Sequence, residues 1–349
     1  MRPIVGVSFG SEFGGHERAA ADLLMEMGRL TNVLMLCDAA NVRLMEFCQS
    51  KDLMFQAYSR RMDLLQWLWG LRSKYRVIFL PGNLFIGSVE SGLCRLIGMS
   101  MSVYIPYYLD HEKLNGWFLG LLKNKFQFVC LTAYSDVITI SQAAKQGVLQ
   151  AQPGKEVYLL SNKVPKFESR RPMSITKYDC LLIGRIYFKQ KGQDRAIEFL
   201  ERFSRTTGRR LSVAIAGVGV DGDRLERILK RKTLNTYEVL GYCSDTAELY
   251  SKCKVVLVPS RFEGVPFVIL ESLSAEVALV VSDIPVFRHL LGDEHTLDFE
   301  SDDFSLLERA LEPEFCPLRL DELELESYNE VENYLNEDNF RRSNTSGSV

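Results

Sequence analysis

Two glutamates eight positions apart, Glu263 and Glu271, follow a short β-branched run at 255–258. An apolar helical pattern begins near Phe267, which places Glu263 in a loop and Glu271 one turn inside a helix. The backbone N–H groups of Phe267 and Val268 then belong to a helix N-terminus, which binds anions. Carboxylates beside an anion site suit a ligand that carries both hydroxyls and phosphate, such as a nucleotide sugar. The alternative is a charged cap and a surface glutamate.

Two cations follow a second predicted strand at 179–184. Arg185 comes directly after it, and Lys191 stands before Gly192, where a helical pattern opens. Together they could neutralise a pyrophosphate, because arginine offers a planar fork of donors and lysine a point charge. A solvated basic loop is the alternative, since Lys189 lies in the same segment.

Glycine-rich turns follow two further predicted strands. Gly14 and Gly15 join the first strand to the first helix, where they would let a ligand approach the backbone closely. A plain glycine loop explains them equally well. The run from Gly217 to Gly222 has the G-x-G-x-x-G spacing of dinucleotide-binding proteins. It also contains Asp221, a carboxylate where a pyrophosphate would lie, so a tight turn is our interpretation and a nicotinamide- or flavin-dependent oxidoreductase a distant alternative.

These residues require alternating strands and helices to position them. Predicted strands lie at 3–9, 33–37, 53–58, 76–81, 101–107, 136–141 and 156–161, and then at 179–184, 211–216, 238–242, 254–259 and 278–282. Predicted helices include 16–28, 193–206, 223–232, 245–252, 267–276 and 285–291. Such alternation predicts parallel sheets covered on both faces, with ligands at the carboxyl ends of the strands. The polar, proline-containing segment 162–172 is the predicted linker between two Rossmann-like units.

The composition is that of an ordinary globular protein, with 349 residues, 46% hydrophobic and 25% charged. No apolar stretch approaches the roughly 18 residues that span a bilayer, and the first residues are too short an apolar run for a signal peptide. The net charge of −3 hides an asymmetry. Residues 1–165 hold 17 Lys and Arg against 13 Asp and Glu, whereas 312–349 hold 3 against 10. The basic half could meet an anionic partner, although no nucleic acid is expected.

The eight cysteines form no C-x-x-C pair, and most of them lie in or beside apolar runs. We interpret them as buried, reduced thiols of a cytoplasmic protein. A zinc site would need the paired spacing that the sequence lacks, so no metal is expected.

Two basic and aromatic stretches in the first half suit an anionic membrane surface. The first covers 60–76 and contains Trp67 and Trp69; the second contains Lys113, Trp117, Lys123 and Lys125. Amphipathic helices of this composition lie on anionic lipid, which favours peripheral association at the inner face of the cell membrane. Ordinary core packing with solvated charges is the alternative.

Taken together, the motifs resemble the retaining, family 4-like glycosyltransferases, also called glycosyl transferases group 1. Four motifs stand in the family's order over residues 10–291: Gly14-Gly15, Gly184-Arg185 with Lys191-Gly192, Gly217-Val-Gly219, and the E-x7-E element from Glu263 to Glu271. The resemblance implies an α/β GT-B fold of two Rossmann-like domains facing across a cleft. These would be an acceptor domain at 1–165 and a nucleotide-sugar donor domain at 166–311, followed by an acidic helix and disordered tail at 312–349.

The resemblance also implies roles for the residues. Arg185 and Lys191 would hold the donor diphosphate without a metal or other cofactor, Glu263 would orient the donor sugar, and Glu271 would bind the ribose. Further donor-site residues would be Gly14, Gly15, Gly217, Gly264, Phe267 and Val268. The expected reaction moves a hexose-type sugar, with retention, from a nucleotide sugar to a glycan or lipid-linked acceptor in bacterial surface polysaccharide or lipopolysaccharide assembly. Alternatives are another GT-B nucleotide-sugar enzyme, such as an epimerase or hydrolase, and a non-catalytic glycosyltransferase-like partner.

Two segments depart from the family pattern. The family places a small-Gly-x-Pro stretch after the second glutamate, and this chain has 275–278 as Ala-Glu-Val-Ala. The family's cleft histidine corresponds to His111, where the local match is loose. A catalytic residue and a surface histidine are both compatible with His111.

Overall fold

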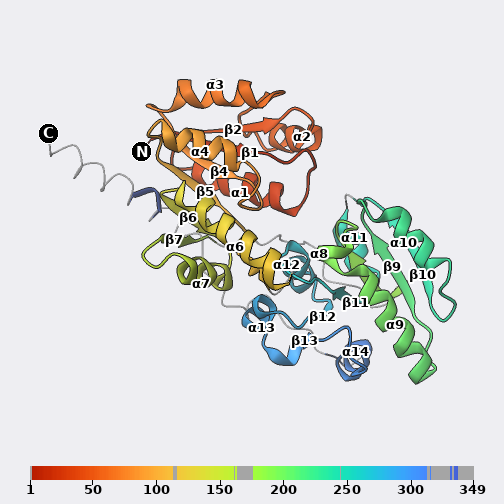
Figure 1. Cartoon of the computed structure of the whole chain (residues 1–349). Helices are drawn as coiled ribbons and strands as arrows, with labels where there is room; N and C mark the ends of the chain where they lie inside the picture. The colour runs from red at the N-terminus through yellow and green to blue at the C-terminus, as the bar shows by residue number, and fades with distance from the viewer. Residues whose placement is uncertain are drawn as a thin grey trace. The chain divides into compact units, whose positions relative to one another are not determined.

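A computed structural model describes residues 2–112, 116–160, 162, 176–243, 245–312, 315, 331 and 334–336. The chain divides into two compact units, Met1–Lys163 with Leu325–Val349, and Val164–Glu324. Figure 1 shows the elements of both. Each unit contains one parallel sheet, as the alternating pattern predicts. The predicted acidic tail at 312–349 lies almost entirely outside the described residues, as does Lys113 of the predicted second basic stretch.

The first unit has a seven-stranded parallel sheet in the order β3-β2-β1-β4-β5-β6-β7. The strands are β1 (Ile4–Ser8), β2 (Val33–Asp38), β3 (Phe55–Tyr58), β4 (Arg76–Leu80), β5 (Met101–Tyr104), β6 (Asp136–Thr139) and β7 (Glu156–Leu159). Every residue of β1 and β4 is buried, because helices cover both faces of such a sheet.

Helices connect these strands. They are α1 (Gly15–Gly28), α2 (Val42–Ser50), α3 (Arg61–Leu71), α4 (Ser88–Leu96), α6 (Trp117–Thr132) and α7 (Gln142–Ala151). One buried cluster joins α3, α4, α6 and α7 to one face of the sheet; it includes Val7, Phe79, Val103, Leu64, Leu68, Cys94, Leu131 and Val148. These four helices therefore form one layer of the unit.

The C-terminal part of the chain returns to this unit. The ring of Tyr334 lies 3.9 Å from the Arg76 guanidinium, and its hydroxyl donates a 2.8 Å hydrogen bond to the Ser102 hydroxyl. Arg76 in turn lies 3.5 Å from the Asp136 carboxylate. Arg76, Ser102 and Asp136 lie at the starts of β4, β5 and β6. Tyr334 therefore covers the amino edge of the sheet.

The second unit has a six-stranded parallel sheet in the order β10-β9-β8-β11-β12-β13. The strands are β8 (Tyr178–Ile183), β9 (Ser212–Ala216), β10 (Thr236–Gly241), β11 (Cys253–Val258), β12 (Ala278–Ser282) and β13 (Thr296–Leu297). The helices are α8 (Phe188–Lys191), α9 (Gln193–Thr207), α10 (Gly222–Leu229), α11 (Thr246–Ser251), α12 (Phe267–Ser274), α13 (Pro285–Leu291) and α14 (Ser305–Leu311), with a 3-10 turn at Asp293–His295. The phenylalanines of α9 and the leucines of α14 pack on β8, β9, β11 and β12.

The twelve predicted strands and the six predicted helices all form, with ends shifted by a few residues. No range was predicted for β13 or for the helices α2, α4, α7, α8 and α14. Of these, β13 and α8 have only two and four residues. Six of the seven described cysteines are buried, all seven are free, and Cys243 is half-buried. Burial raises the pKa of the Cys94 thiol to about 11, which disfavours the reactive thiolate. The buried-thiol prediction is therefore confirmed for these six.

Candidate functional site

The predicted donor residues other than Gly14 and Gly15 follow β8, β9 and β11 in the second unit. The strand order reverses between β8 and β11, since β8 continues to β9 on one side while β11 continues to β12 on the other. In open parallel sheets this reversal leaves a crevice at the carboxyl ends, where ligands bind. The strand order therefore makes the carboxyl edge of this sheet the candidate ligand site.

An ion pair joins the two most informative motifs. The Lys191 ammonium, at the end of α8, lies 2.5 Å from the Glu263 carboxylate in the loop after β11. The Ser260 hydroxyl donates a 2.9 Å hydrogen bond to the same oxygen. The Glu263 side chain is only 7% exposed and that of Lys191 is 22% exposed. Two predicted residues 72 positions apart are thus in direct contact, and Lys191 is not part of a solvated basic loop.

Two glycines allow this close approach of the loops. Gly192, between α8 and α9, has a φ of +67°, and a Cβ there would lie 2.0 Å from the Pro259 carbonyl oxygen. Gly217, after β9, has a φ of +140°, and a Cβ would lie 1.9 Å from the Gly184 carbonyl oxygen. Only glycine tolerates both the conformation and the contact. The run from Gly217 to Gly222 is accordingly a tight turn, as we interpreted it, and the Asp221 carboxylate accepts a 2.8 Å hydrogen bond from the Phe188 N–H.

Two arginines brace the loop that carries Glu263. Arg261 forms a two-pronged ion pair with Asp194, at 3.0 and 3.1 Å, and also donates to the Phe188 carbonyl. Arg195 donates to the carbonyl oxygens of Pro259 and Ser260, each at 2.7 Å. These charge-assisted bonds tie the loop after β11 to α8 and α9. The residues just before Glu263 are therefore held in place by both helices.

The helix after this loop begins where the sequence predicted. Pro266 is the N-cap of α12, Phe267 is its first residue, and Gly264 is buried in the loop before it. Glu271 is only 4% exposed, and its carboxylate accepts a 2.9 Å hydrogen bond from the buried Tyr250 hydroxyl. The alternative of a charged cap and a surface glutamate is wrong, because both carboxylates are largely buried.

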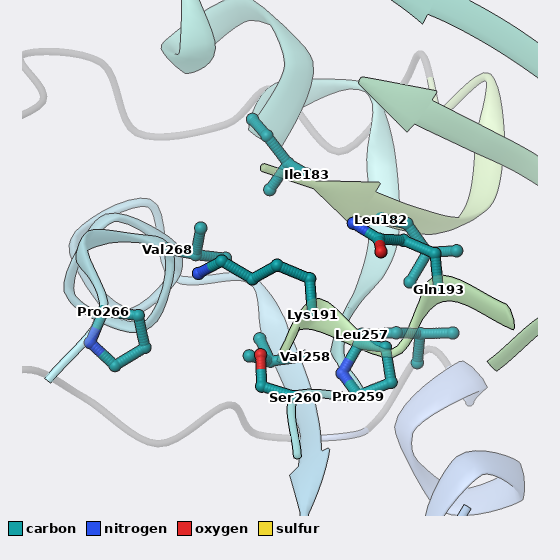
Figure 2. A pocket seen from close by; sticks show the side chains of 10 residues that line it. All are labelled: Leu182, Ile183, Lys191, Gln193, Leu257, Val258, Pro259, Ser260, Pro266 and Val268. Carbon is teal, nitrogen blue, oxygen red and sulfur yellow. The ribbon is translucent and has the colours of Figure 1, made fainter. Parts of the chain in front are cut away.

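A small pocket, open to solvent, lies at this point (Figure 2). Its walls are the ends of β8 and β11, the loop after β11, and the starts of α9 and α12. The lining residues are Leu182, Ile183, Lys191, Gln193, Leu257, Val258, Pro259, Ser260, Pro266 and Val268. In Figure 2 the Lys191 side chain extends toward Val268 of α12. The pocket therefore combines a cation, a hydroxyl and the start of a helix, which are groups that bind an anion.

Arg185 lies at the rim of this site. It lies two residues after the end of β8 and is exposed. Its guanidinium is 5.6 Å from the centre of the Tyr187 ring and 3.4 Å from the Gln190 side-chain oxygen. The neighbouring Lys189 is exposed as well. Of the three cations in the segment, Lys191 alone enters the pocket lining.

The remaining predicted residues belong to the first unit. Gly14 is the N-cap of α1 and donates its N–H to the Glu17 carboxylate at 3.0 Å, and Gly15 is the first helical residue. His111 is 6% exposed; its ring lies 5.2 Å from that of Phe85. The His111 Nε2 atom is 3.3 Å from the Gln127 side-chain oxygen. The surface-histidine alternative is therefore wrong.

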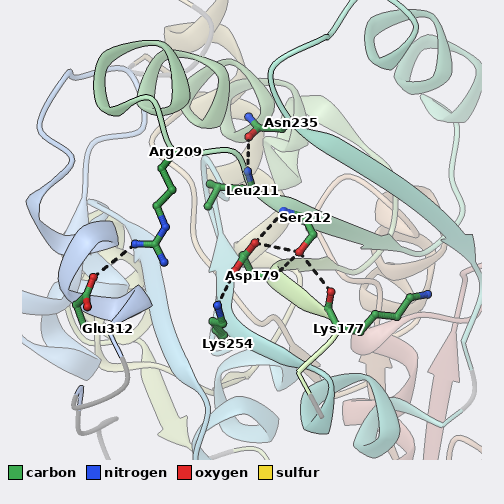
Figure 3. A network of polar contacts seen from close by, with 8 residues as sticks. All are labelled: Lys177, Asp179, Arg209, Leu211, Ser212, Asn235, Lys254 and Glu312. Atoms are coloured by element: carbon green, nitrogen blue, oxygen red, sulfur yellow. Dashed lines mark hydrogen bonds and ion pairs between the residues drawn. The ribbon is translucent and has the colours of Figure 1, made fainter. Parts of the chain in front are cut away.

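A second polar network lies at the opposite edge of the same sheet (Figure 3). Asp179 of β8 accepts from the Ser212 N–H at 2.9 Å and pairs with Lys254 at 2.7 Å. Burial alone would raise the pKa of Asp179, but the hydrogen bonds from Lys254 and Ser212 outweigh it and hold the pKa below its ordinary value. Because these residues start β8, β9 and β11, the network fastens the amino edge and leaves the carboxyl edge to the site.

Among the residues that the structure describes, no group of three or more His, Cys, Asp and Glu side chains could hold a metal ion. No helix in that part of the chain is long and apolar enough to cross a bilayer.

Sequence reasoning missed the residues that support the site. Ser260, Arg261, Asp194, Arg195 and Tyr250 all contact a predicted residue or its loop. Ser260 and Arg261 stand three and two positions before Glu263, so their closeness in the sequence could have indicated them. Tyr250 and Arg195 carry no such signal, because only the packing of α11 and α9 brings them to the loop.

Comparison with known proteins places the second unit in a family. Residues 166–311 match the family Glycosyl transferases group 1. An Escherichia coli protein named O-antigen biosynthesis glycosyltransferase WclY is 29% identical over 113 residues. That match covers 32% of this chain and 30% of the relative, so it spans less than a third of either protein.

Solved glycosyltransferases have the same fold over most of the chain. The lipopolysaccharide outer core galactosyltransferase WaaB superposes with a TM-score of 0.60 at 17% identity, covering 88% of this chain and 90% of its own. HepE of Anabaena, solved with UDP-glucose, gives 0.63 at 16% identity and covers 84% of both chains. WaaG, a glycosyltransferase of lipopolysaccharide biosynthesis, gives 0.61 at 15%, covering 88% of this chain and 90% of its own. Residues 166–311 therefore match the glycosyl transferases group 1 family, within a chain that has the two-domain GT-B fold of these solved glycosyltransferases.

Proposed function

We propose that this chain is a retaining glycosyltransferase that moves a hexose-type sugar from a nucleotide sugar to a glycan or lipid-linked acceptor. The observation that carries the proposal is the contact between Lys191 and Glu263 at the carboxyl edge of the family-matched unit. The contact brings together the two motifs that a nucleotide-sugar donor needs, a cation for its diphosphate and a carboxylate for its hydroxyls.

In this proposal, Lys191 and Arg185 bind the donor diphosphate, with Gly217 and the N–H groups of Phe267 and Val268 close to the phosphates. Negative charge grows on the leaving diphosphate as the glycosidic bond breaks, and fixed cations stabilise that charge most in the transition state. Two cations at this position make a metal unnecessary for the leaving group. Gly14 and Gly15 would let the acceptor side and the donor diphosphate meet.

Glu263 would orient the hydroxyls of the transferred sugar, and Glu271 would bind the ribose, held in place by the Tyr250 hydroxyl. The acceptor hydroxyl attacks on the face from which the diphosphate leaves, and a departing phosphate oxygen takes the acceptor proton. This step retains the configuration at the anomeric carbon. His111, buried against Phe85 and beside Gln127, is a candidate for ordering the acceptor side.

We further propose that the acceptor belongs to lipopolysaccharide or O-antigen assembly, and that the enzyme works in the cytoplasm at the inner face of the membrane. The named roles of WclY, WaaB and WaaG support this assignment. The UDP-glucose in the HepE complex makes UDP-hexoses the first donors to test.

A thermal-shift screen of UDP- and GDP-sugars tests the donor, because a ligand that binds the folded chain raises its melting temperature. With the donor known, transfer of labelled sugar to lipid-linked glycan acceptors is measured in the presence of EDTA, and NMR of the product reports its anomeric configuration. Replacing Glu263, Lys191 or Arg185 should each lower turnover by about 100-fold or more.

Three results would contradict the proposal. An inverted product would refute the retaining step, and loss of activity in EDTA would refute the metal-free one. Release of free sugar with no acceptor product would favour a hydrolase, which is one of the alternative functions that the sequence left open.

A further inference from the structure

The ion pair between Lys191 and Glu263 joins the two groups that the proposed function assigns to different parts of the donor. The Lys191 ammonium lies 2.5 Å from the Glu263 carboxylate. It is the one charged group among the ten described residues that line the pocket. The pair as a whole carries no net charge, so while it is intact it attracts a diphosphate only weakly. A diphosphate that binds Lys191 must therefore compete with Glu263 for the ammonium.

Glu263 is poorly placed to lose this partner. Its side chain is only 7% exposed, so little water can replace the ammonium. The Ser260 hydroxyl still donates its 2.9 Å hydrogen bond, but one neutral donor does not compensate a buried negative charge. A carboxylate that stays close to the bound phosphates also repels them. Binding of a diphosphate at Lys191 therefore costs free energy, unless the ligand itself donates hydrogen bonds to Glu263.

Of the two partners, Lys191 is the one that can move. Its side chain is 22% exposed, and a lysine ammonium has three donors on a flexible four-carbon stem. The loop that carries Glu263 is instead tied to α8 and α9 through Arg195 and Arg261. In Figure 2 the Lys191 side chain extends toward Val268 at the start of α12. The ammonium can therefore turn from the carboxylate to phosphates beside α12 while Glu263 keeps its position.

We infer that Glu263 makes the site discriminate between the nucleotide sugar and the free nucleoside diphosphate that remains after transfer, an inference that rests on the proposed function. Both ligands carry the diphosphate that draws Lys191 away. Only the nucleotide sugar carries the hexose hydroxyls that, in the proposed function, donate hydrogen bonds to Glu263 in place of the ammonium. The nucleoside diphosphate leaves the carboxylate buried and unpaired. One carboxylate therefore favours the substrate and weakens the binding of the product.

Release of the product is the step that this discrimination speeds. After transfer the hexose has left with the acceptor, so the hydroxyls that satisfied Glu263 are gone and the carboxylate again competes for the Lys191 ammonium. The exposed Arg185 at the rim still attracts the diphosphate. A site with both cations and no carboxylate would hold the nucleoside diphosphate more tightly, and tighter binding of a product slows its dissociation.

Calorimetric titration of the full chain with UDP-glucose and with UDP tests the inference; GDP-mannose and GDP replace them if the thermal-shift screen selects guanosine nucleotides. Glu263→Gln keeps the size of the side chain and an oxygen for the Ser260 hydroxyl, but it removes the charge. This variant should bind UDP about tenfold more tightly than the wild type, because Lys191 no longer shares its charge with a carboxylate. It should bind UDP-glucose less tightly, because an amide oxygen is a weaker acceptor for hydroxyls. Inhibition of transfer by added UDP should become stronger, although turnover falls.

The matched control is Glu271→Gln, which removes a second buried carboxylate of the same motif. Glu271 is 4% exposed, and its carboxylate accepts a hydrogen bond from the Tyr250 hydroxyl. In the proposed function it binds the ribose, which UDP and UDP-glucose share. Its replacement should therefore weaken both ligands alike and leave the ratio of their dissociation constants within about twofold of the wild-type ratio. Thermal melts establish that both variants are folded.

Two results would overturn the inference while leaving the proposed function in place. One is a wild type that binds both ligands together with a Glu263→Gln variant whose affinity for UDP is unchanged or lower, which would assign Glu263 a supporting role in its loop. The other is an equal change of the ratio in Glu271→Gln. A wild type that binds none of these nucleotides and nucleotide sugars would instead refute the donor site of the proposed function, and the inference with it.

Discussion

Replacing Lys191 by methionine should destabilise the second unit, because it leaves Glu263 without its ammonium partner. The Glu263 side chain is 7% exposed, and after the replacement the Ser260 hydroxyl still donates a hydrogen bond to it. Removing one partner of a fully buried pair costs about 3 to 5 kcal/mol. Lys191 is 22% exposed, so solvent offsets part of that, and we expect a loss of about 2 kcal/mol.

The assay is thermal unfolding of the wild type, Lys191→Met, Glu263→Gln and the double variant, without donor. A loss of about 2 kcal/mol corresponds to a fall in melting temperature of about 4 to 8 °C for a unit of this size. Glu263→Gln should cost less, because the partly exposed ammonium can reach water. The double variant should be more stable than Lys191→Met alone, since no carboxylate is then left buried and unpaired.

Turnover separates this electrostatic effect from the catalytic role. The double variant should regain stability without regaining activity, because both groups that face the donor are then missing. A Lys191→Met protein as stable as the wild type would refute the buried pair, and near-wild-type transfer by it would refute the diphosphate role.

Three further predictions follow from the same unit. Gly217→Ala should cost more than about 3 kcal/mol, as its Cβ would meet a carbonyl oxygen at 1.9 Å, whereas Gly208→Ala, at a φ of +74° in open space, should cost only about 1 kcal/mol in urea melts. Asp179 has a lowered folded-state pKa, so its contribution to stability is present above the ordinary value of 3.8 and is lost as the pH falls through the folded value. Urea melts between about pH 5 and about pH 3 should show a weaker acid dependence in Asp179→Asn, and an unchanged dependence would contradict the network. Tyr250→Phe removes a buried hydrogen bond to Glu271 and should weaken donor binding by about tenfold in calorimetric titration, with a loss of stability of about 1 to 2 kcal/mol; unaltered affinity would disprove the positioning role.

Much of the fold could be predicted because its signals are local. Each buried strand of a parallel sheet is a short apolar run, and each connecting helix has a periodic stripe, so the twelve strands and six helices appear in the sequence. Short elements escaped this reasoning. A two-residue strand such as β13 and a four-residue helix such as α8 are too short to show a period.

The candidate site was predictable where a residue follows a strand closely, as Arg185 does, or where two carboxylates share a helix start, as Glu263 and Glu271 do. The burial of those carboxylates was not predictable from their type, since glutamate is usually exposed. Lys191 and Lys189 look alike in the sequence. Both lie on the short helix α8, where side chains two positions apart point to different sides, so the first lines the pocket and the second is exposed.

The sequence by itself determined the alternation of elements, the two parallel sheets and the strand ends at which polar groups stand, because those depend on neighbours a few residues apart. Only the tertiary structure decided which groups meet. The order of the strands brings β8 beside β11, and so places Lys191 against Glu263 across 72 positions.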